Sequence, residues 1–204
     1  MRPHLERLVC DPHEASQRCA AEIITGLIRG SKHWPFSKVE AMWAWLTPLL
    51  RTAFGHITVE SINDWGTAIA TASENRDPNR IHWLMELIME EPIRADQGAF
   101  TDSSRLYLLQ GGISQQEWRV AQLLKRLLDL LRPYLNHPYQ NVRDRLGSVL
   151  TNVFLHDIDL PHGNRSWSPR VNDFVYEILP QLATVLDTSN RDSLVPRFFI
   201  LYFI

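Results

Sequence analysis

The sequence predicts an all-α fold in which antiparallel helix pairs stack into a HEAT-like helical-repeat solenoid. Residues 139–154 carry the strongest signal, because their apolar side chains recur at three- and four-residue spacing, as on one face of a helix. A helix with such a stripe needs neighbouring helices to bury it. Similar stripes and helix-end signals recur along the chain, and strand-like alternation never extends beyond a few residues. These patterns favour a stack of helices over a closed enzyme fold.

The first two predicted helices begin at recognisable capping residues. Asp11 and Pro12 form an N-cap and a first-turn proline, and Gly30 ends the helix that they start. Ser37 and Glu40 have the spacing of a capping box, which predicts that the second helix begins there. Its apolar residues continue the helical stripe to about residue 50.

Three further helices are predicted before the middle of the chain. One covers about 59–73, and an Asp-Pro pair at 77–78 starts the next, which ends near residue 92. A fifth helix is predicted at 103–110. The glycine pair at 111–112 is interpreted as its stop signal, because glycine is common just after the last turn of a helix.

The second half of the chain contains the longest predicted helix. Ser114 and Glu117 form another capping box, and the helix that follows is predicted to continue to about residue 135. The helix at 139–154 comes next, and a last helix is predicted at about 174–186.

The predicted helices pair into hairpins that begin near residues 11, 59, 100 and 139. This spacing is close to the ~40 residues of HEAT-type repeats. We therefore predict one HEAT-like α-solenoid of about four helix pairs over residues 1–188. Residues 189–204 are predicted to form a divergent apolar tail, because FFILYFI is an uncharged run of residues that favour strands.

Composition narrows the class of protein. The 21 basic and 23 acidic residues nearly balance, which argues against direct nucleic-acid binding. No apolar run approaches the roughly 18 residues that a membrane span needs, so we expect no membrane contact. Cys10 and Cys19 are interpreted as reduced thiols that face the core of an intracellular protein. We expect the protein in the nucleus and the cytoplasm.

Two groups of residues have side chains that could bind a metal. His156, Asp157, Asp159 and His162 share one loop, but their spacing matches no familiar zinc pattern. We favour a polar loop there, and a small hydrolase or metal enzyme that uses this loop is the alternative. The second group, His4, Cys10, His13 and Cys19, lacks the paired cysteines of a zinc site. We predict no metal, no cofactor and no catalytic residues.

Basic residues provide the remaining candidates for a binding site. One group surrounds a predicted turn and consists of Arg29, Lys32, His33 and Lys38. The other is the pair Arg143 and Arg145 at a helix start. Either group has the chemistry to bind an acidic partner or a phosphorylated ligand, although solvated charge is the default interpretation. Arg143 and Arg145 are our candidates for partner binding. The seven tryptophans are interpreted as packing anchors between helices.

Three long phrases resemble a known family: QRCAAEIITGLIRGSKHW, RLYLLQGGISQQEWRV and NVRDRLGSVLTNVF. They resemble the proteasome activator complex subunit 4 family, whose members are large ATP-independent proteasome activators. The resemblance covers roughly residues 5–186 and corresponds to an internal section in the C-terminal half of the family chain. It implies a HEAT-like solenoid that winds into a dome over the end of the proteasome core particle.

The resemblance also implies a function without chemistry of its own. Family members open the gate of the core particle without ATP, admit peptides or unfolded chains, and are linked with nuclear turnover of acetylated histones and with DNA repair. The implied partners are the core particle and, through parts of the family chain that are absent here, acetylated histones. The alternative is a helical-repeat adaptor for another protein, without proteasome activation.

Two departures from the family pattern concern the end of the chain. The family inserts a tail with a penultimate tyrosine into the core particle, whereas the penultimate residue here is Phe203 and Tyr202 lies one place earlier. From residue 188 onward the sequence no longer resembles the family. Because neither terminus supplies a polar capping repeat, we expect a fragment whose ends correspond to the interior of a longer solenoid.

Overall fold

The computed structural model describes residues 2–90, 92–93, 98–114, 123–154, 176–177 and 180. The regular structure of these residues is helical, which confirms the all-α prediction. The chain divides into two compact units, one of residues 1–90 and 111–116 and the other of residues 91–110 and 117–204. Within the described part of the chain, no helix combines the length and apolar character that crossing a membrane requires.

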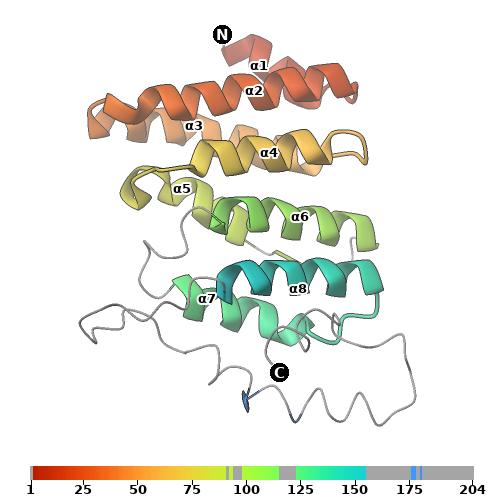
Figure 1. Ribbon diagram of the computed structural model, residues 1–204. Helices are drawn as coiled ribbons and strands as arrows, with labels where there is room; N and C mark the ends of the chain where they lie inside the picture. The colour runs from red at the N-terminus through yellow and green to blue at the C-terminus, as the bar shows by residue number, and fades with distance from the viewer. Residues whose placement is uncertain are drawn as a thin grey trace, which may run out of the picture. The chain divides into compact units, whose positions relative to one another are not determined.

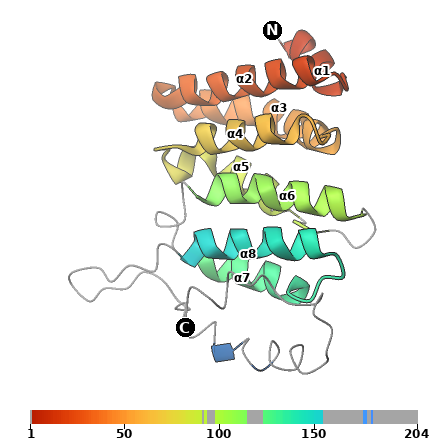
Figure 2. The same ribbon diagram turned by 45° about the vertical axis from the view of Figure 1, so that its right-hand side comes forward.

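The first unit packs its helices in two layers. In chain order they are α1 (Arg2–Cys10), α2 (Glu14–Gly30), the short 3-10 helix η1 (Ser31–His33), α3 (Phe36–Gly55), α4 (Ile62–Ser73) and α5 (Pro78–Met89). α2 lies beside α4, α3 lies beside α5, and α1 contacts both α2 and α3. In Figure 1 and Figure 2, α2 and α4 form one layer with α3 and α5 behind them. Successive helices therefore alternate between the layers, as in a helical-repeat stack.

Aliphatic side chains and two tryptophans form the core of the first unit. Trp43 of α3 and Trp65 of α4 are fully buried, and the indole N–H of Trp43 donates to the Arg80 carbonyl at 3.0 Å. These two tryptophans act as the packing anchors that the sequence predicted. The largest fully buried side chains of this unit also include Leu5, Ile24, Ile28, Leu46, Leu50, Ile69, Ile81 and Leu84.

Two of the predicted helix ends are confirmed. α2 ends at Gly30. α5 begins at Pro78, and the side chain of Asp77 accepts a hydrogen bond from the backbone N–H of Asn79 at 2.9 Å. This bond satisfies one of the first backbone N–H groups, which have no partner inside the helix.

The predicted capping box at Ser37 is wrong. α3 begins at Phe36, and its N-cap is Pro35, which makes no side-chain capping bond. The extended backbone of Pro35 (φ −53°, ψ 145°) lets the helix start ahead of Ser37. Ser37 therefore lies within the first turn rather than before it.

Neither α1 nor the residue that holds its end was predicted from the sequence. Gln17 of α2 is fully buried, and its amide Nε2 donates to the carbonyl oxygens of Val9 at 3.0 Å and Asp11 at 2.6 Å. Its Oε1 accepts from the indole N–H of Trp65 in α4 at 2.9 Å. One amide thus donates to a carbonyl in the last turn of α1 and to one in the turn that follows, and it joins α1, α2 and α4. α1 itself buries only Leu5 and Val9, so its stripe is short.

α2 begins at Glu14 with His13 at its N-cap, so the prediction that Asp11 and Pro12 start this helix is wrong. Asp11 lies in the turn between α1 and α2, and its side chain binds the start of α2. Its carboxylate accepts from the backbone N–H of His13 at 3.0 Å and from the Ser16 hydroxyl at 2.8 Å, and His13 Nδ1 lies 2.6 Å from Oδ1. These bonds, the His13 backbone N–H first, lower the pKa of Asp11 from 3.8 to about 2. The carboxylate therefore stabilises the folded state in its charged form.

We expect replacement of Asp11 by asparagine to reduce stability in a pH-dependent way. Because the pKa of Asp11 is lower in the folded protein, its contribution is complete above about pH 4 and is lost as the pH falls toward 2. Urea unfolding from pH 7 to pH 2 should give a lower free energy of unfolding for Asp11→Asn than for the wild type at pH 7. This difference should disappear as the pH falls from about 4 toward 2. Ser16→Ala removes one bond to the carboxylate. In a protein that carries Ser16→Ala, the further substitution Asp11→Asn should therefore lower the free energy of unfolding by less. A difference between Asp11→Asn and the wild type that stays constant with pH would contradict this assignment.

The second unit contains most of α6 (Gly98–Ile113), α7 (Leu123–Leu131), the 3-10 helix η2 (Arg132–Tyr134) and α8 (Gln140–Phe154). α8 begins one residue after the predicted start at 139 and ends at the predicted residue 154. The buried side chains of the stripe are Val142, Leu146, Val149 and Leu150. The side chains at 153–154, residues 115–122 of the predicted long helix, most of the predicted helix at 174–186, and the predicted tail at 189–204 lie outside the described residues.

The glycine pair at 111–112 is not a helix stop, because α6 continues to Ile113. A Cβ atom on Gly111 would lie 3.0 Å from the carbonyl oxygen of Gly66 in α4. A Cβ atom on Gly112 would collide with Cδ1 of Ile88 in α5. These glycines therefore allow the end of α6 to approach α4 and α5 closely. The Ser114 hydroxyl donates to the Gly111 carbonyl at 2.9 Å, so this side chain binds the end of α6.

Candidate functional site

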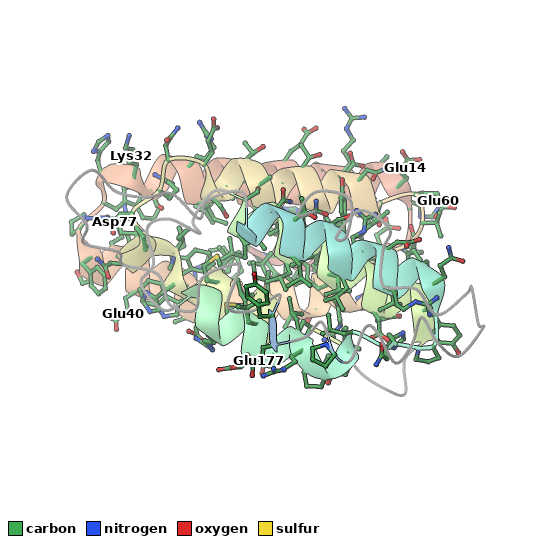
Figure 3. All side chains as sticks on the ribbon, turned by 60° about the horizontal axis from the view of Figure 1, so that its bottom comes forward. Glu14, Lys32, Glu40, Glu60, Asp77 and Glu177 are labelled. Carbon is green, nitrogen blue, oxygen red and sulfur yellow. The ribbon has the colours of Figure 1, made fainter. Side chains whose placement is uncertain are left out.

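A basic cavity lies where α2 ends and α5 begins, within the first unit. Its volume is about 230 Å³. Figure 3 shows Lys32 and Asp77, which both line it, at the same end of the unit. The lining residues are Ser31, Lys32, His33, Asn75, Arg76, Asp77, Arg80 and Ile81. The structure thus places two members of the predicted basic group, Lys32 and His33, together with two arginines that sequence reasoning missed.

Two arginines beside the cavity link the C-terminal ends of α2 and α4: Arg29 of α2 binds the end of α4, and Arg76, which follows α4, binds the end of α2. Arg29, in the last turn of α2, donates through Nη1 to the Thr71 carbonyl of α4 at 2.8 Å and to Glu74 Oε2 at 3.0 Å. Arg76, which follows α4, donates through Nη2 to the Ile28 carbonyl of α2. The last carbonyls of a helix have no partner inside it, and a cation also interacts favourably with this end of the helix dipole. The arginines therefore fix the cavity wall.

Arg80 fixes the other wall of the cavity. Its Nη1 donates to the Trp34 carbonyl at 2.8 Å, which ties the N-terminal part of α5 to the turn before α3. Its own carbonyl accepts from the Trp43 indole N–H at 3.0 Å. Backbone and side chain of one residue thus hold the turn and the core together.

The charges around the cavity favour an anion. Burial lowers the pKa of Arg76, and the nearby charges of Arg29 and Arg80 lower it further. The contribution of Arg29 and Arg80 to the lowered pKa arises because nearby guanidinium groups repel one another, so that each disfavours the charge of its neighbours. Asp77 is the one carboxylate in the lining, and it already accepts the bond from Asn79. A carboxylate or phosphate in the cavity would reduce the repulsion among the cations.

A wider groove runs between α2 and α4. Its volume is about 430 Å³, and its lining is mostly small: Ala21, Thr25, Gly26, Thr67, Ala68 and Thr71, with Arg18, Glu22, Arg29 and Asp64 at its edges. The Thr25 hydroxyl crosses it to the Ala68 carbonyl at 3.3 Å. Because charges of both signs border this groove, it favours no single ligand chemistry.

Arg143, the first of our partner-binding candidates, is buried in the second unit. Its side chain is 3% exposed, and Nη1 donates to the carbonyl oxygens of His137 at 2.7 Å and Pro138 at 2.9 Å. The guanidinium therefore holds the loop that leads into α8. Its role in partner binding stays a prediction, and that role would require the loop to move.

Arg145, the second candidate, is half-buried and joins α8 to α6. Its guanidinium lies 4.5 Å from the ring centre of Tyr107, and Nη1 donates to Gln110 Oε1 at 3.3 Å. Arg143 and Arg145 both lie on α8, but they do not form one exposed basic patch, because the Arg143 side chain is buried against the loop before the helix. Partner binding by Arg145 also stays a prediction.

The contact between Arg145 and Tyr107 should contribute measurably to stability. A double-mutant cycle with Arg145→Ala and Tyr107→Leu is expected to give a coupling free energy of about 0.5–1 kcal/mol, the usual range for a cation–π pair that is not fully desolvated. Urea unfolding of the four proteins measures it. Additive losses would mean that the ring and the guanidinium do not interact.

Comparison with known proteins assigns the chain to a family. The family model described as "Proteasome activator complex subunit 4-like, HEAT repeat-like" matches residues 1–111, which is more than half of the 204 residues. The chain belongs to this family. The match confirms the resemblance found in the sequence and supports the helical-repeat fold.

Curated members of the family are similar over nearly the whole chain. Proteasome activator complex subunit 4 of Bos taurus is 58% identical over 94% of this chain, and that of Homo sapiens is 56% identical over 94%. Proteasome activator complex subunit 4A of Danio rerio is 57% identical over 89%. In each case the match covers 10% of the relative, so this chain spans about a tenth of the length of its curated relatives.

The remaining candidates from the sequence are placed as follows in this family member. Cys10 and Cys19 are free thiols, and both are exposed, so the expectation that they face the core is wrong. Each occupies a position just outside the apolar stripe of its helix. The described residues contain no group of three metal-compatible side chains. The loop with His156, Asp157, Asp159 and His162 lies outside the described residues.

Proposed function

We propose that this chain is a segment of an ATP-independent proteasome activator and acts as a non-catalytic scaffold that binds the proteasome core particle. The family assignment and the 58% identity over 94% of the chain to a protein named proteasome activator complex subunit 4 carry the proposal. Because the chain spans a tenth of that relative, its affinity for the core particle should be weaker than that of a complete activator.

The fold supports a scaffold role. Stacked helices present extended surfaces whose shape is fixed by contacts between neighbouring helices. Here the bonds of Gln17, Arg29, Arg76 and Arg80 tie neighbouring helices and turns of the first unit to one another. Such a stack holds surface residues in place without needing a catalytic centre. The alternative function, a helical-repeat adaptor for a different protein, would use the same scaffold.

A solution assay with a fluorogenic peptide tests the proposal. The purified chain alone should leave the peptide intact, and addition of the chain to latent core particles should increase peptide hydrolysis by the core particle. Hydrolysis by the chain alone would contradict the non-catalytic role. An unchanged rate, together with no binding, would favour the adaptor.

The finer part of the proposal concerns substrates and location. We propose that the activator promotes degradation of peptides and acetylated histones and works in the nucleus and the cytoplasm. Family resemblance supports this part. Because histone binding is attributed to parts of the family chain that are absent here, core particles incubated with a complete family activator should degrade acetylated core histones faster than unmodified ones. Equal rates would remove acetylated histones from the proposal.

A further inference from the structure

An exposed aromatic patch lies on α3 and α5. Phe36, the first residue of α3, is 49% exposed although it is a large apolar side chain. Its ring centre lies 5.9 Å from that of Trp83 in α5, and Trp83 stacks on the buried Trp43 at 6.0 Å. The patch therefore rests on the core and presents a firm apolar surface to solvent.

The aromatic patch adjoins the basic cavity. Arg80 lines the cavity and Trp83 belongs to the patch, and residues three apart in a helix lie on the same face about one turn, or ~5 Å, apart. The turn between α2 and α3 also links the basic cavity to the aromatic patch. Arg80 binds the Trp34 carbonyl, and the ammonium group of Lys38 lies 3.9 Å from the centre of the Trp34 ring.

The combined surface is cationic on one side and apolar on the other. Lys32 and His33 are exposed beside the cavity, and Lys38 is exposed beside Trp34. Of the carboxylates around the cavity, Asp77 accepts the bond from Asn79 and Glu74 pairs with Arg29 at 3.0 Å. Glu40, one turn beyond Phe36, adds an exposed carboxylate at the outer edge. Cations thus outnumber carboxylates where the cavity opens.

The size of the cavity limits what enters it. At about 230 Å³ it is smaller than the roughly 300–1,000 Å³ of pockets that take drug-sized ligands. It accommodates one acidic side chain, while the neighbouring aromatic patch offers a contact for an apolar side chain. A small phosphate compound would use the cavity alone and leave the patch unused.

We propose that this surface binds an acidic peptide segment, with one Asp or Glu carboxylate in the cavity beside Lys32 and His33 and an adjacent apolar side chain against Phe36 and Trp83. Charge complementarity selects the acidic group, and the aromatic patch selects a peptide over a free anion. The inference goes beyond the proposed function, because it requires neither the core particle nor activation of it.

Fluorescence anisotropy with the full chain tests the inference. The probe is the fluorescein-labelled peptide EEDFEE, and the comparison probe is QQNFQQ, which keeps the apolar residue and removes the charges. We expect binding of the first probe, at least about tenfold weaker binding of the second, and weakening by added salt. Inorganic pyrophosphate, added as a competitor, distinguishes a peptide site from a general phosphate site.

Surface variants locate the binding site. Lys32→Glu combined with His33→Glu should weaken binding of EEDFEE at least about tenfold, and Phe36→Ser should weaken it about threefold to tenfold. Arg18→Glu is the control, because it also reverses the charge of an exposed cation, on a part of α2 about 16 Å from Arg29. It should leave affinity unchanged. Circular dichroism confirms that each variant is folded, since none of these side chains is buried.

Three results would overturn the inference. One is equal affinity of the wild type and the Lys32→Glu, His33→Glu variant. Another is equal affinity for both peptides. The third is displacement of EEDFEE by stoichiometric pyrophosphate with no effect of Phe36→Ser, which would replace the peptide site by a phosphate site.

Discussion

Replacing Gln17 by leucine is expected to lower the free energy of unfolding by about 2–5 kcal/mol, because each buried polar group left without a partner costs about 1–3 kcal/mol. The substitution keeps the volume of the side chain. It removes the donors to the Val9 and Asp11 carbonyls and the acceptor of the Trp65 indole N–H. A loss of this size is a large fraction of the stability of a domain.

Urea unfolding followed by circular dichroism measures the Gln17→Leu effect. Gln140→Leu is the matched control, since Gln140 is exposed in α8 and its replacement should change stability by no more than about 0.5 kcal/mol. If both variants unfold at the wild-type urea concentration, the polar junction of α1, α2 and α4 does not stabilise the fold.

Replacing Gly112 by valine is expected to destabilise the first unit by about 2 kcal/mol or more, through overpacking. Even a Cβ atom at this position meets Cδ1 of Ile88, with Ile69 Cγ2 and Met85 Sδ each 3.6 Å away. All three neighbouring side chains are buried, so the added methyl groups have no free space.

Gly26 provides the matched control for Gly112. It also lies within a helix, but no atom lies within 4 Å of a Cβ added there. Gly26→Val should therefore leave stability unchanged or raise it by a few tenths of a kcal/mol, because glycine is a poor helix former. Thermal unfolding of both variants separates the two effects. Equal melting temperatures for Gly112→Val and the wild type would show that the last residues of α6, 111–113, do not pack closely on α4 and α5.

The sequence predicted those helices whose ends and buried faces are determined by residues close to them in the sequence. The stripe of α8 and the Asp77–Pro78 start of α5 are of this kind, because cap and stripe lie within a few residues of each other. α1 was missed because its end is held by Gln17, and Gln17 in turn by Trp65, 48 residues away. The glycine pair was misread because its neighbours lie in α4 and α5, and a helix stop is the usual local meaning of such a pair.

The candidate site shows the same division between local and distant information. The basic residues around the turn after α2 were visible in the sequence, and Lys32 and His33 do line the cavity. Arg76 and Arg80 were not associated with Lys32 and His33, because they lie just before α5 and in its first turn, more than 40 residues later. The Arg-x-x-x-Arg spacing around Asp77 is the signal that could have suggested a second basic wall. Arg143 looked exposed in the helical pattern, but its long side chain turns back to the preceding loop.

Core-particle binding is tested by native-gel co-migration of the purified chain with latent proteasome core particles, stained for fluorogenic peptide hydrolysis. We expect a slower band that contains both the chain and the core particle and is brighter than the latent core particle alone. A chain that is helical and soluble but leaves the core-particle band unshifted would contradict the claim that this segment is a scaffold for core-particle binding.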